Sequence, residues 1–389
     1  MGIKRLRKFI YLLQLEEYQT SRYNLWLKKH SIDRLEERKN KLRWTTRARL
    51  TLALSLLLNI FSPEEKSVEN ANRFLGPFFK MAQKLIILIA KLKLRFFSPI
   101  TRVVVVGSYG KTTFKEMLAW VLATNSSVFK TPGNINTAIG IAQVILKNLK
   151  KHHQLMIIEA DAYQAGEIKE ICQLIAPNFG VITVIGWMHL ERFGSVDNIR
   201  STKFEMAEFI KDKNRFFYPP KDHQFINFEK TVEKIAGKLF VPTSTIKERI
   251  ASFTPPDHRL TVKKVSQKMI LLDDSYNSNP LGFQKALDKL KSYPHHQRIV
   301  VTPGMIELGS QQFSLNETAG FETAKIADIF VIVGKTNQRA LLSGAKKAKR
   351  KKLRIIFIDK NDRFADKINA FLRPPAAILL ENDLPDHYF

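Results

Sequence analysis

Apolar and polar residues follow two different patterns along the chain, and the change falls near residue 100. Before that point, two apolar stretches of helical length cover residues 50–61 and 74–97. The first carries no charge, and the second is interrupted by basic residues: Lys80, Lys84, Lys91, Lys93 and Arg95. Because neither reaches about 20 uncharged apolar residues, we predict two helices, connected by a turn and an acidic cluster at residues 63–72.

Beyond residue 100, short apolar runs rich in β-branched residues alternate with amphipathic segments. The runs cover residues 103–106, 155–158, 179–185, 269–272, 299–302, 329–333, 354–358 and 377–380. Strands that alternate with helices are typical of parallel sheets. We therefore expect an α/β fold with a central domain over residues 101–255 and a doubly wound, Rossmann-like domain over residues 256–389, preceded by a basic helical segment over residues 1–100.

The charge of the chain indicates an anionic partner. Lys and Arg number 63 against 36 Asp and Glu, a net charge of +27, and residues 1–100 alone contribute 21 against 8, or +13. Interfacial helices with basic side chains toward an anionic membrane are our leading interpretation of this segment. The alternatives are helices packed on the protein's own core and a tilted or re-entrant span. A second basic cluster, residues 346–354, is typical of a solvated face, although contact with lipid or with a diphosphate is an alternative.

Other features bear on the compartment and on the class of partner. Glu16 and Glu17 follow the first apolar run, where a secretory signal would have a cleavage site. Cys172 is the single cysteine, so an internal disulfide is excluded and a cytoplasmic setting is the default. We find no nucleic-acid recognition motif and no basic stripe interleaved with aromatic residues, so we expect no nucleic acid as partner.

The best candidate site follows the run at 103–106. The next residues are Gly107-Ser108-Tyr109-Gly110-Lys111-Thr112-Thr113, and a helical pattern continues to about residue 123. A strand, a glycine loop and a helix in this order are typical of a phosphate loop. Backbone N–H groups, the helix N-terminus and Lys111 would bind phosphate, and the Thr112 hydroxyl would face magnesium. A full Walker A motif would have glycine in place of Val105, and a simple glycine turn before a helix is the structural alternative.

Polar side chains at the ends of the next two runs extend this site. Glu159 and Asp161 follow the run at 155–158, and His189 and Glu191 follow the run at 179–185. Because α/β sheets build their sites at the carboxyl ends of strands, we expect these groups to face a divalent cation that bridges ATP phosphates.

From about residue 102 onward the sequence resembles the ATP-dependent Mur ligases, in particular the branch that adds D-alanyl-D-alanine to a cell-wall precursor. The resemblance rests on the loop at 107–113 and on the segments at 131–137, 272–280 and 304–309. It implies ATP and Mg²⁺, two ions in all, with Thr112, Glu159 and His189 as metal ligands. It also implies a metal-facing, carbamylated Lys203.

The resemblance also assigns residues around the nucleotide. Arg259 would turn toward the ATP phosphates, and Asp274 and Asn277 would hold the nucleotide across a closing cleft. Gln224 and Asn227 fall where the family begins an adenine-binding helix, although the first asparagine of that motif is replaced by Gln224. The expected catalytic residues are thus Lys111, Lys203, Arg259 and Asp274. The expected ATP contacts are loop residues 107–113 together with Gln224, Asn227, Arg259, Asp274 and Asn277.

The implied reaction joins D-alanyl-D-alanine to a peptide of the uridine-diphosphate-linked precursor through an acyl phosphate, at the cytoplasmic face of the membrane. Two departures from the family affect this expectation. Residues 1–100 do not resemble a nucleotide-sugar domain, and Lys203 and His223 are only 20 positions apart. Alternatives are the same chemistry on a lipid-linked acceptor, or a non-catalytic, membrane-bound assembly factor.

Overall fold

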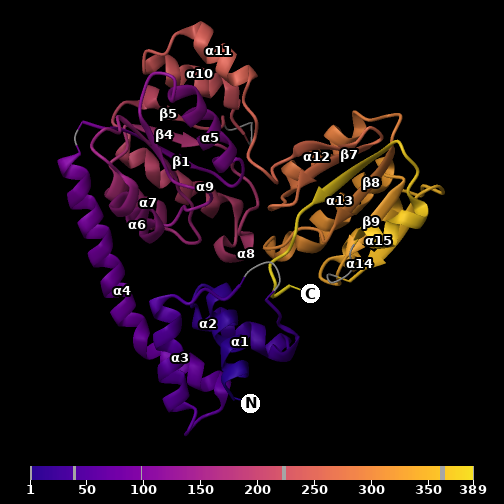
Figure 1. The fold of residues 1–389 in the computed structure, drawn as a ribbon, viewed down its shortest axis with the longest axis horizontal. Coiled ribbons are helices and arrows are strands. Elements are labelled where there is room, and N and C mark those ends of the chain that lie inside the picture. Colours follow the sequence, from indigo (N-terminus) through magenta and orange to yellow (C-terminus); the bar gives the residue numbers. More distant parts are fainter. Residues whose placement is uncertain (1, 38–40, 98, 221–224, 360–363, 389) are drawn as a thin grey trace. The chain divides into compact units, whose positions relative to one another are not determined.

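The computed structural model describes residues 2–37, 41–97, 99–220, 225–359 and 364–388 (Figure 1). The chain forms two compact units. The first comprises Met1–Leu85 together with Leu384–Phe389, and the second comprises Ile86–Asp383. The first unit is thus built from both ends of this sequence.

Four helices belong wholly or partly to the first unit: α1 (Gly2–Leu15), α2 (Thr20–Lys29), α3 (Thr46–Leu58) and the N-terminal part of α4 (Glu64–Phe96). A short 3₁₀ turn, Ile32–Arg34, lies between α2 and α3. These helices enclose a small core of their own around Phe9, Tyr23 and Trp26. No described helix is both long enough and apolar enough to cross a membrane.

The expected connection at residues 63–72 is wrong, because this segment is already helical. Helix α4 begins at Glu64, directly after Pro63. Glu64 and Glu65 occupy its first turn, where carboxylates interact favourably with the positive end of the helix dipole. The acidic cluster therefore stabilises the start of α4 instead of interrupting the helical segment.

The C-terminal residues complete the core of the first unit. The Tyr11 hydroxyl donates a buried hydrogen bond of 2.7 Å to Asp386, and Trp26 Nε1 donates one of 2.9 Å to the carbonyl of His387. Burial and the adjacent Asp386 raise the pKa of Tyr11 above its ordinary value. Both aromatic side chains thus satisfy their polar atoms with residues from the other end of the sequence.

The second unit contains a five-stranded sheet with the order β2-β3-β1-β4-β5, in which all pairs are parallel. Its strands are β1 (Thr101–Val106), β2 (Val128–Lys130), β3 (Leu155–Glu159), β4 (Phe179–Ile182) and β5 (Phe216–Phe217). Its helices are α5 (Lys111–Leu122), α6 (Ala138–Asn148), α7 (Glu167–Ile175), α8 (Leu190–Phe193), α9 (Val196–Phe204), α10 (Phe228–Lys238) and α11 (Thr243–Ala251). Because Val105 pairs with Glu159, β1 and β3 end at the same edge.

A second, six-stranded sheet in this unit has the order β10-β9-β8-β11-β7-β6. Its strands are β6 (Thr261–Ser266), β7 (Met269–Asp274), β8 (Gln297–Thr302), β9 (Ile329–Val333), β10 (Arg354–Ile358) and β11 (Ala376–Glu381). Its helices are α12 (Pro280–Lys291), α13 (Gln312–Ile326), α14 (Gln338–Lys347) and α15 (Phe364–Ile368). Only β6 among these described strands is antiparallel. The expected α/β class and the mostly parallel second sheet are confirmed.

Candidate functional site

The glycine loop leaves β1 and leads directly into α5, as the sequence predicts. Gly110 has a φ of +75° and caps α5, which begins at Lys111. A Cβ atom on Gly107 would lie 2.0 Å from Thr183 Oγ1. Only glycine therefore fits at position 107 without moving the neighbouring chain, and the left-handed conformation at position 110 favours glycine for a different reason.

The loop is held in place by the segment that follows β4. Thr183 Oγ1 donates a 2.6 Å hydrogen bond to the carbonyl of Tyr109. Ser108 Oγ donates to the carbonyl of Gly186 at 3.1 Å and accepts from its N–H at 3.0 Å. The loop thus has a fixed shape, with the N-terminus of α5 directly behind it, as phosphate binding by backbone N–H groups requires.

Asp161 connects the two lysines that the sequence singles out. Its carboxylate lies 2.7 Å from Lys111 Nζ and 3.6 Å from Lys203 Nζ, and all three side chains are buried. Burial by itself would raise the pKa of Asp161, but the charges of Lys111, Lys203 and His189 hold it below its ordinary value. Burial lowers the pKa of Lys203 to about 8. The sequence places Asp161 at a strand end, but its contact with both lysines depends on tertiary structure.

Lys115 is a site residue that sequence reasoning missed. Its fully buried ammonium lies 3.3 Å from Glu159 and donates to the carbonyls of Thr131 and Gly133 at 2.8 and 2.6 Å. Lys115 therefore fixes the start of the 131–137 segment against the strand end that carries Glu159. A lysine within a helix is usually solvated, so only the spacing of four residues from Lys111, on the same helix face, could have indicated its position.

His189 has the character of a metal ligand. It adopts a left-handed conformation (φ +56°) before α8, and its Nδ1 is hydrogen-bonded to Glu307. Its Nε2 is buried and has no hydrogen-bond partner among the described residues. A ring nitrogen oriented by a carboxylate, with the other nitrogen free, is the usual arrangement of a metal-binding histidine. His189 thus fits the role that the family resemblance implies.

The expected metal-binding residues do not form a complete protein cage. In the described part of the chain, no three His, Cys, Asp or Glu side chains converge on one point. Magnesium is usually bound by one or two carboxylates together with substrate phosphates and water. Thr112 and Glu159 offer oxygen atoms and His189 a ring nitrogen, which are the ligand types that such a partial shell would use. In its unmodified form, Lys203 forms an ion pair with Asp161.

Arg259, two residues before β6 of the second sheet, contacts the last part of the loop. Arg259 Nη2 donates a 3.1 Å hydrogen bond to Thr112 Oγ1, and its guanidinium lies 4.2 Å from the centre of the Tyr276 ring. Burial, opposed by Arg259, raises the pKa of Asp274 to about 6. Glu381 pairs with Asp274 on the adjacent strand, and burial raises its pKa as well. Sequence reasoning did not identify Glu381.

A cavity of about 530 Å³ lies where the loop and the second sheet meet. Most of the expected nucleotide contacts line it: Tyr109, Gly110, Thr113, Asn227, Arg259, Asp274 and Asn277. Asn227 also caps α10, its side chain accepting from the N–H of Lys230. Gln224 lies outside the described residues. The cavity thus brings together residues that the sequence placed in two separate domains.

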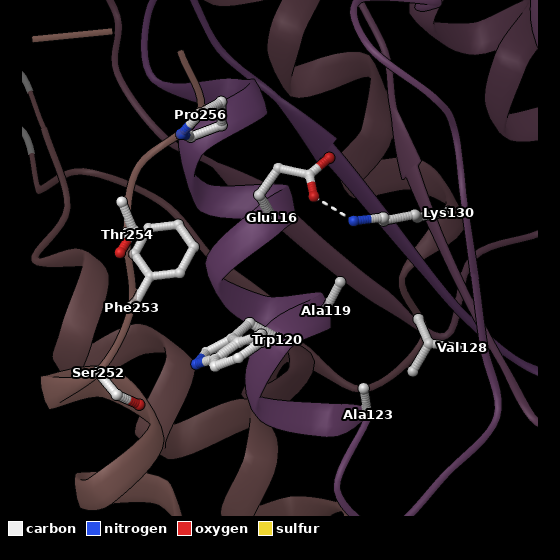
Figure 2. A pocket seen from close by; sticks show the side chains of 10 residues that line it. All are labelled: Glu116, Ala119, Trp120, Ala123, Val128, Lys130, Ser252, Phe253, Thr254 and Pro256. Carbon is white, nitrogen blue, oxygen red and sulfur yellow. Dashed lines mark hydrogen bonds and ion pairs between the residues drawn. The ribbon is translucent and has the colours of Figure 1, made fainter. Parts of the chain in front are cut away.

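A second cavity, of about 450 Å³, lies on a different part of α5 (Figure 2). It is lined by Glu116, Trp120 and Lys130 together with residues 252–254, and Figure 2 shows the ion pair between Glu116 and Lys130. None of the expected site residues lines this cavity. It is therefore separate from the candidate site.

The fold and the site together define a phosphate-loop α/β protein whose site is completed by a second, doubly wound sheet. Residues 105–272 match the model of the Mur ligase middle domain, and residues 258–381 match that of the Mur ligase glutamate ligase domain. The two matches together run from residue 105 to residue 381. The chain therefore belongs to the Mur ligase family.

Curated relatives and solved structures agree with this assignment. UDP-N-acetylmuramoyl-tripeptide--D-alanyl-D-alanine ligase of Haemophilus influenzae is 26% identical over 62% of this chain and 65% of its own length. The Bacillus subtilis enzyme of the same name is 24% identical over 57% and 60%. The chain therefore spans less than two thirds of these relatives.

The fold is similar to that of MurF structures. MurF from Acinetobacter baumannii has a TM-score of 0.66 and 21% identity, with 77% of each chain covered. MurF from Thermotoga maritima in complex with ADP has a TM-score of 0.62 and 24% identity, covering 77% of this chain and 80% of that one. The likeness agrees with the expected α/β fold.

Proposed function

We propose that this chain is an ATP-dependent amide ligase of peptidoglycan precursor synthesis. It adds D-alanyl-D-alanine to the peptide of a UDP-N-acetylmuramoyl-tripeptide-type acceptor. The observation that carries the proposal is the contact between Arg259 and Thr112, which joins the phosphate loop to the second sheet at the edge of a 530 Å³ cavity. The names of the curated relatives support the choice of substrates.

The proposed reaction has two steps. A carboxylate oxygen of the acceptor attacks the γ-phosphorus of ATP, and the bond to the β-phosphate oxygen breaks to release ADP. The amine of D-alanyl-D-alanine then attacks the carbonyl carbon of the acyl phosphate, loses a proton and expels inorganic phosphate. The protein has to position these groups and to neutralise charge on the transferring phosphoryl group.

Side chains of the glycine loop and of the cavity wall divide this work. Lys111, released from Asp161, and Arg259 place positive charge beside the transferring phosphate. Asp274, Asn227 and Asn277 contact the nucleoside from the cavity walls. Because these residues come from two sheets, closure of one on the other completes the site and excludes water.

Thr112, Glu159 and His189 would hold the magnesium that accompanies ATP. The family pattern implies two magnesium ions. Bound magnesium would supply positive charge to the phosphate oxygens. Carbamylation of Lys203 is part of the proposal. Its burial and its lowered pKa support reaction of the neutral amine with carbon dioxide. A carbamate would stand beside the Asp161 carboxylate, so this form requires a cation between the two anions.

The proposal places the enzyme in the cytoplasm, at the inner face of the cell membrane. The basic composition of residues 1–100 supports this location. A lipid-linked acceptor, the alternative substrate, would be encountered at the same surface. A non-catalytic assembly factor is less well supported, because Lys111, Lys203 and Asp161 form one buried cluster at the loop.

Phosphate release from ATP and magnesium tests the proposal. We expect release only when UDP-N-acetylmuramoyl-tripeptide and D-alanyl-D-alanine are both present, with the amide product identified by mass spectrometry. Release with a lipid-linked acceptor alone would change the substrate but keep the chemistry. No turnover with either acceptor, and no binding of ATP, would refute the ligase. A carbamate signal from ¹³C-labelled bicarbonate, absent in Lys203→Arg, tests the modification separately.

A further inference from the structure

Helix α4 carries an exposed apolar stripe along one face. Phe74, Phe78, Met81, Leu85, Leu88 and Leu92 follow one another at alternating intervals of four and three residues. Residues at these intervals lie on one face of a helix, and Figure 1 shows α4 as one continuous helix. The six side chains are between 42% and 68% exposed. Exposed large apolar residues in such a continuous row indicate an interaction surface.

Along the C-terminal part of α4, the face opposite the stripe is packed against the core of the second unit. Ala90 and Leu94 are buried in the core of the central sheet, and Ile86 and Ile87 pack against it. Lys93 donates two hydrogen bonds of 2.9 Å to the carbonyls of Ile145 and Leu146, near the C-terminal end of α6. The C-terminal part of α4 thus packs on the five-stranded sheet through this face, whereas Leu88 and Leu92 on the other face are exposed.

A row of cations follows the stripe along one side. At about 100° per residue, Arg73, Lys80, Lys84, Lys91 and Arg95 lie about 100° around the helix from the centre of the stripe. Residues 70–96 contain no Asp or Glu. Lys80, Lys84, Lys91 and Arg95 have no ion-pair partner among the described residues, whereas Arg73 pairs with Glu69. An apolar face flanked by unpaired cations is typical of helices that lie in an anionic membrane interface.

We propose that this face of α4 binds an anionic lipid surface, with the apolar stripe inserted among the acyl chains and the cations against the headgroups. This inference names the surface that would hold the enzyme at the membrane. It rests on the proposed membrane location, and it does not depend on the proposed ligase reaction. The same spacing also occurs in coiled coils. A second copy of the acid-free stretch 70–96 would bring only positive flanking charges together, so repulsion disfavours self-association and the charge favours anionic lipid.

Flotation of the full chain with vesicles tests the proposal. We expect binding to vesicles of phosphatidylcholine and phosphatidylglycerol in equal parts, and at least about tenfold weaker binding to phosphatidylcholine alone. The variant Lys80→Glu/Lys84→Glu/Lys91→Glu should lose at least about tenfold in affinity for the anionic vesicles. The variant Met81→Ser/Leu85→Ser/Leu88→Ser should lose binding to both. Circular dichroism of each variant verifies that α4 stays folded.

A matched control uses the other basic cluster of the chain. Lys346→Glu/Lys349→Glu/Lys351→Glu changes the net charge by the same amount at exposed positions, and should bind vesicles as the unmodified chain does. We call the triple substitution at Lys80, Lys84 and Lys91 the Lys80 variant, and the one at Met81, Leu85 and Leu88 the Met81 variant. An equal loss of vesicle affinity in the control, or undiminished vesicle binding by the Lys80 variant, would overturn the proposal. A dimer in vesicle-free solution that the Met81 variant converts to a monomer would assign the face to a second copy instead.

Phosphate release without vesicles separates this proposal from the ligase. The Lys80 variant should retain turnover, because none of its three lysines is among the residues that form the candidate site. Normal flotation without turnover would refute the ligase reaction alone, and turnover without flotation would refute lipid binding alone.

Discussion

Lysine side chains occupy opposite environments at the phosphate loop and along α4. Lys111, Lys115 and Lys203 are 6%, 0% and 3% exposed, and each lies beside a buried Asp or Glu. Lys80 and Lys84 are exposed on a helix whose last 27 residues, 70–96, contain no acid. The buried cations are balanced within the chain, so the excess positive charge lies mostly on surfaces. The net charge of the chain therefore counts two kinds of lysine together: buried lysines that are paired with acids, and exposed lysines on the surface.

The largest expected effect concerns the balance inside the site. Asp161→Asn leaves Lys111 and Lys203 without their shared carboxylate. We expect the free energy of unfolding to fall by about 3–5 kcal/mol, because an uncompensated buried charge is costly. Urea denaturation at neutral pH measures the change. Asp366→Asn, at an exposed position, is the control and should change stability by less than about 0.5 kcal/mol.

Lys111→Met should slow phosphate release by about 10²- to 10³-fold, because it removes a cation from the transferring phosphate while keeping the apolar stem. Lys84→Met removes a cation from α4 and should leave the rate unchanged. Steady-state kinetics with saturating ATP and both substrates compare the two variants. Similar rates for both would contradict the assigned role of Lys111.

The pH dependence of stability tests the burial of Lys203. Its pKa of about 8 lies below the value of about 10.4 expected for an unfolded chain. Between these pH values the unfolded chain binds more protons than the folded chain, so the free energy of unfolding rises with pH. From pH 8 to pH 10, the free energy of unfolding of the chain that keeps Lys203 should rise by about 1–3 kcal/mol more than that of Lys203→Met. Parallel urea-denaturation profiles would show that Lys203 titrates normally.

An effect of similar size is expected in the first unit. Asp386→Ala removes the buried hydrogen bond that the Tyr11 hydroxyl donates to Asp386, which should cost about 1–3 kcal/mol. Because this bond belongs to the first unit, phosphate release should not change. Thermal unfolding followed by Tyr and Trp fluorescence measures the stability. A stability loss accompanied by equal loss of turnover would contradict the independence of the two regions.

Sequence patterns predicted the second unit well because its strands are buried and rich in β-branched residues. The runs at 329–333 and 354–358 coincide with β9 and β10. Strand β6 was missed, since four of its six residues are polar and most of its side chains are exposed. The expected strand at 179–185 ends at Ile182, because the chain then turns to support the glycine loop.

The candidate site was predictable where a chemical role requires a residue type at a given spacing. Glycine at positions 107 and 110 and lysine at 111 satisfy such requirements, and the structure brings Arg259 to the same loop. Lys115 and Glu381 could not be found in this way, because their partners are distant in sequence and their roles arise from burial. The start of α4 was missed because an acidic cluster occurs both in turns and at helix N-termini.

The hydrogen bond between Tyr11 and Asp386 spans 375 positions of the sequence, and it determines when the first unit can be completed during synthesis. At about 5–20 residues per second, Asp386 leaves the peptidyl transferase centre roughly 20–75 s after Tyr11. Until then, the two hydrogen bonds from Tyr11 to Asp386 and from Trp26 to His387 cannot form. Contacts so distant in sequence also slow folding. The helices of the first unit are therefore synthesised first, but their core is completed last, after both sheets of the second unit have been synthesised.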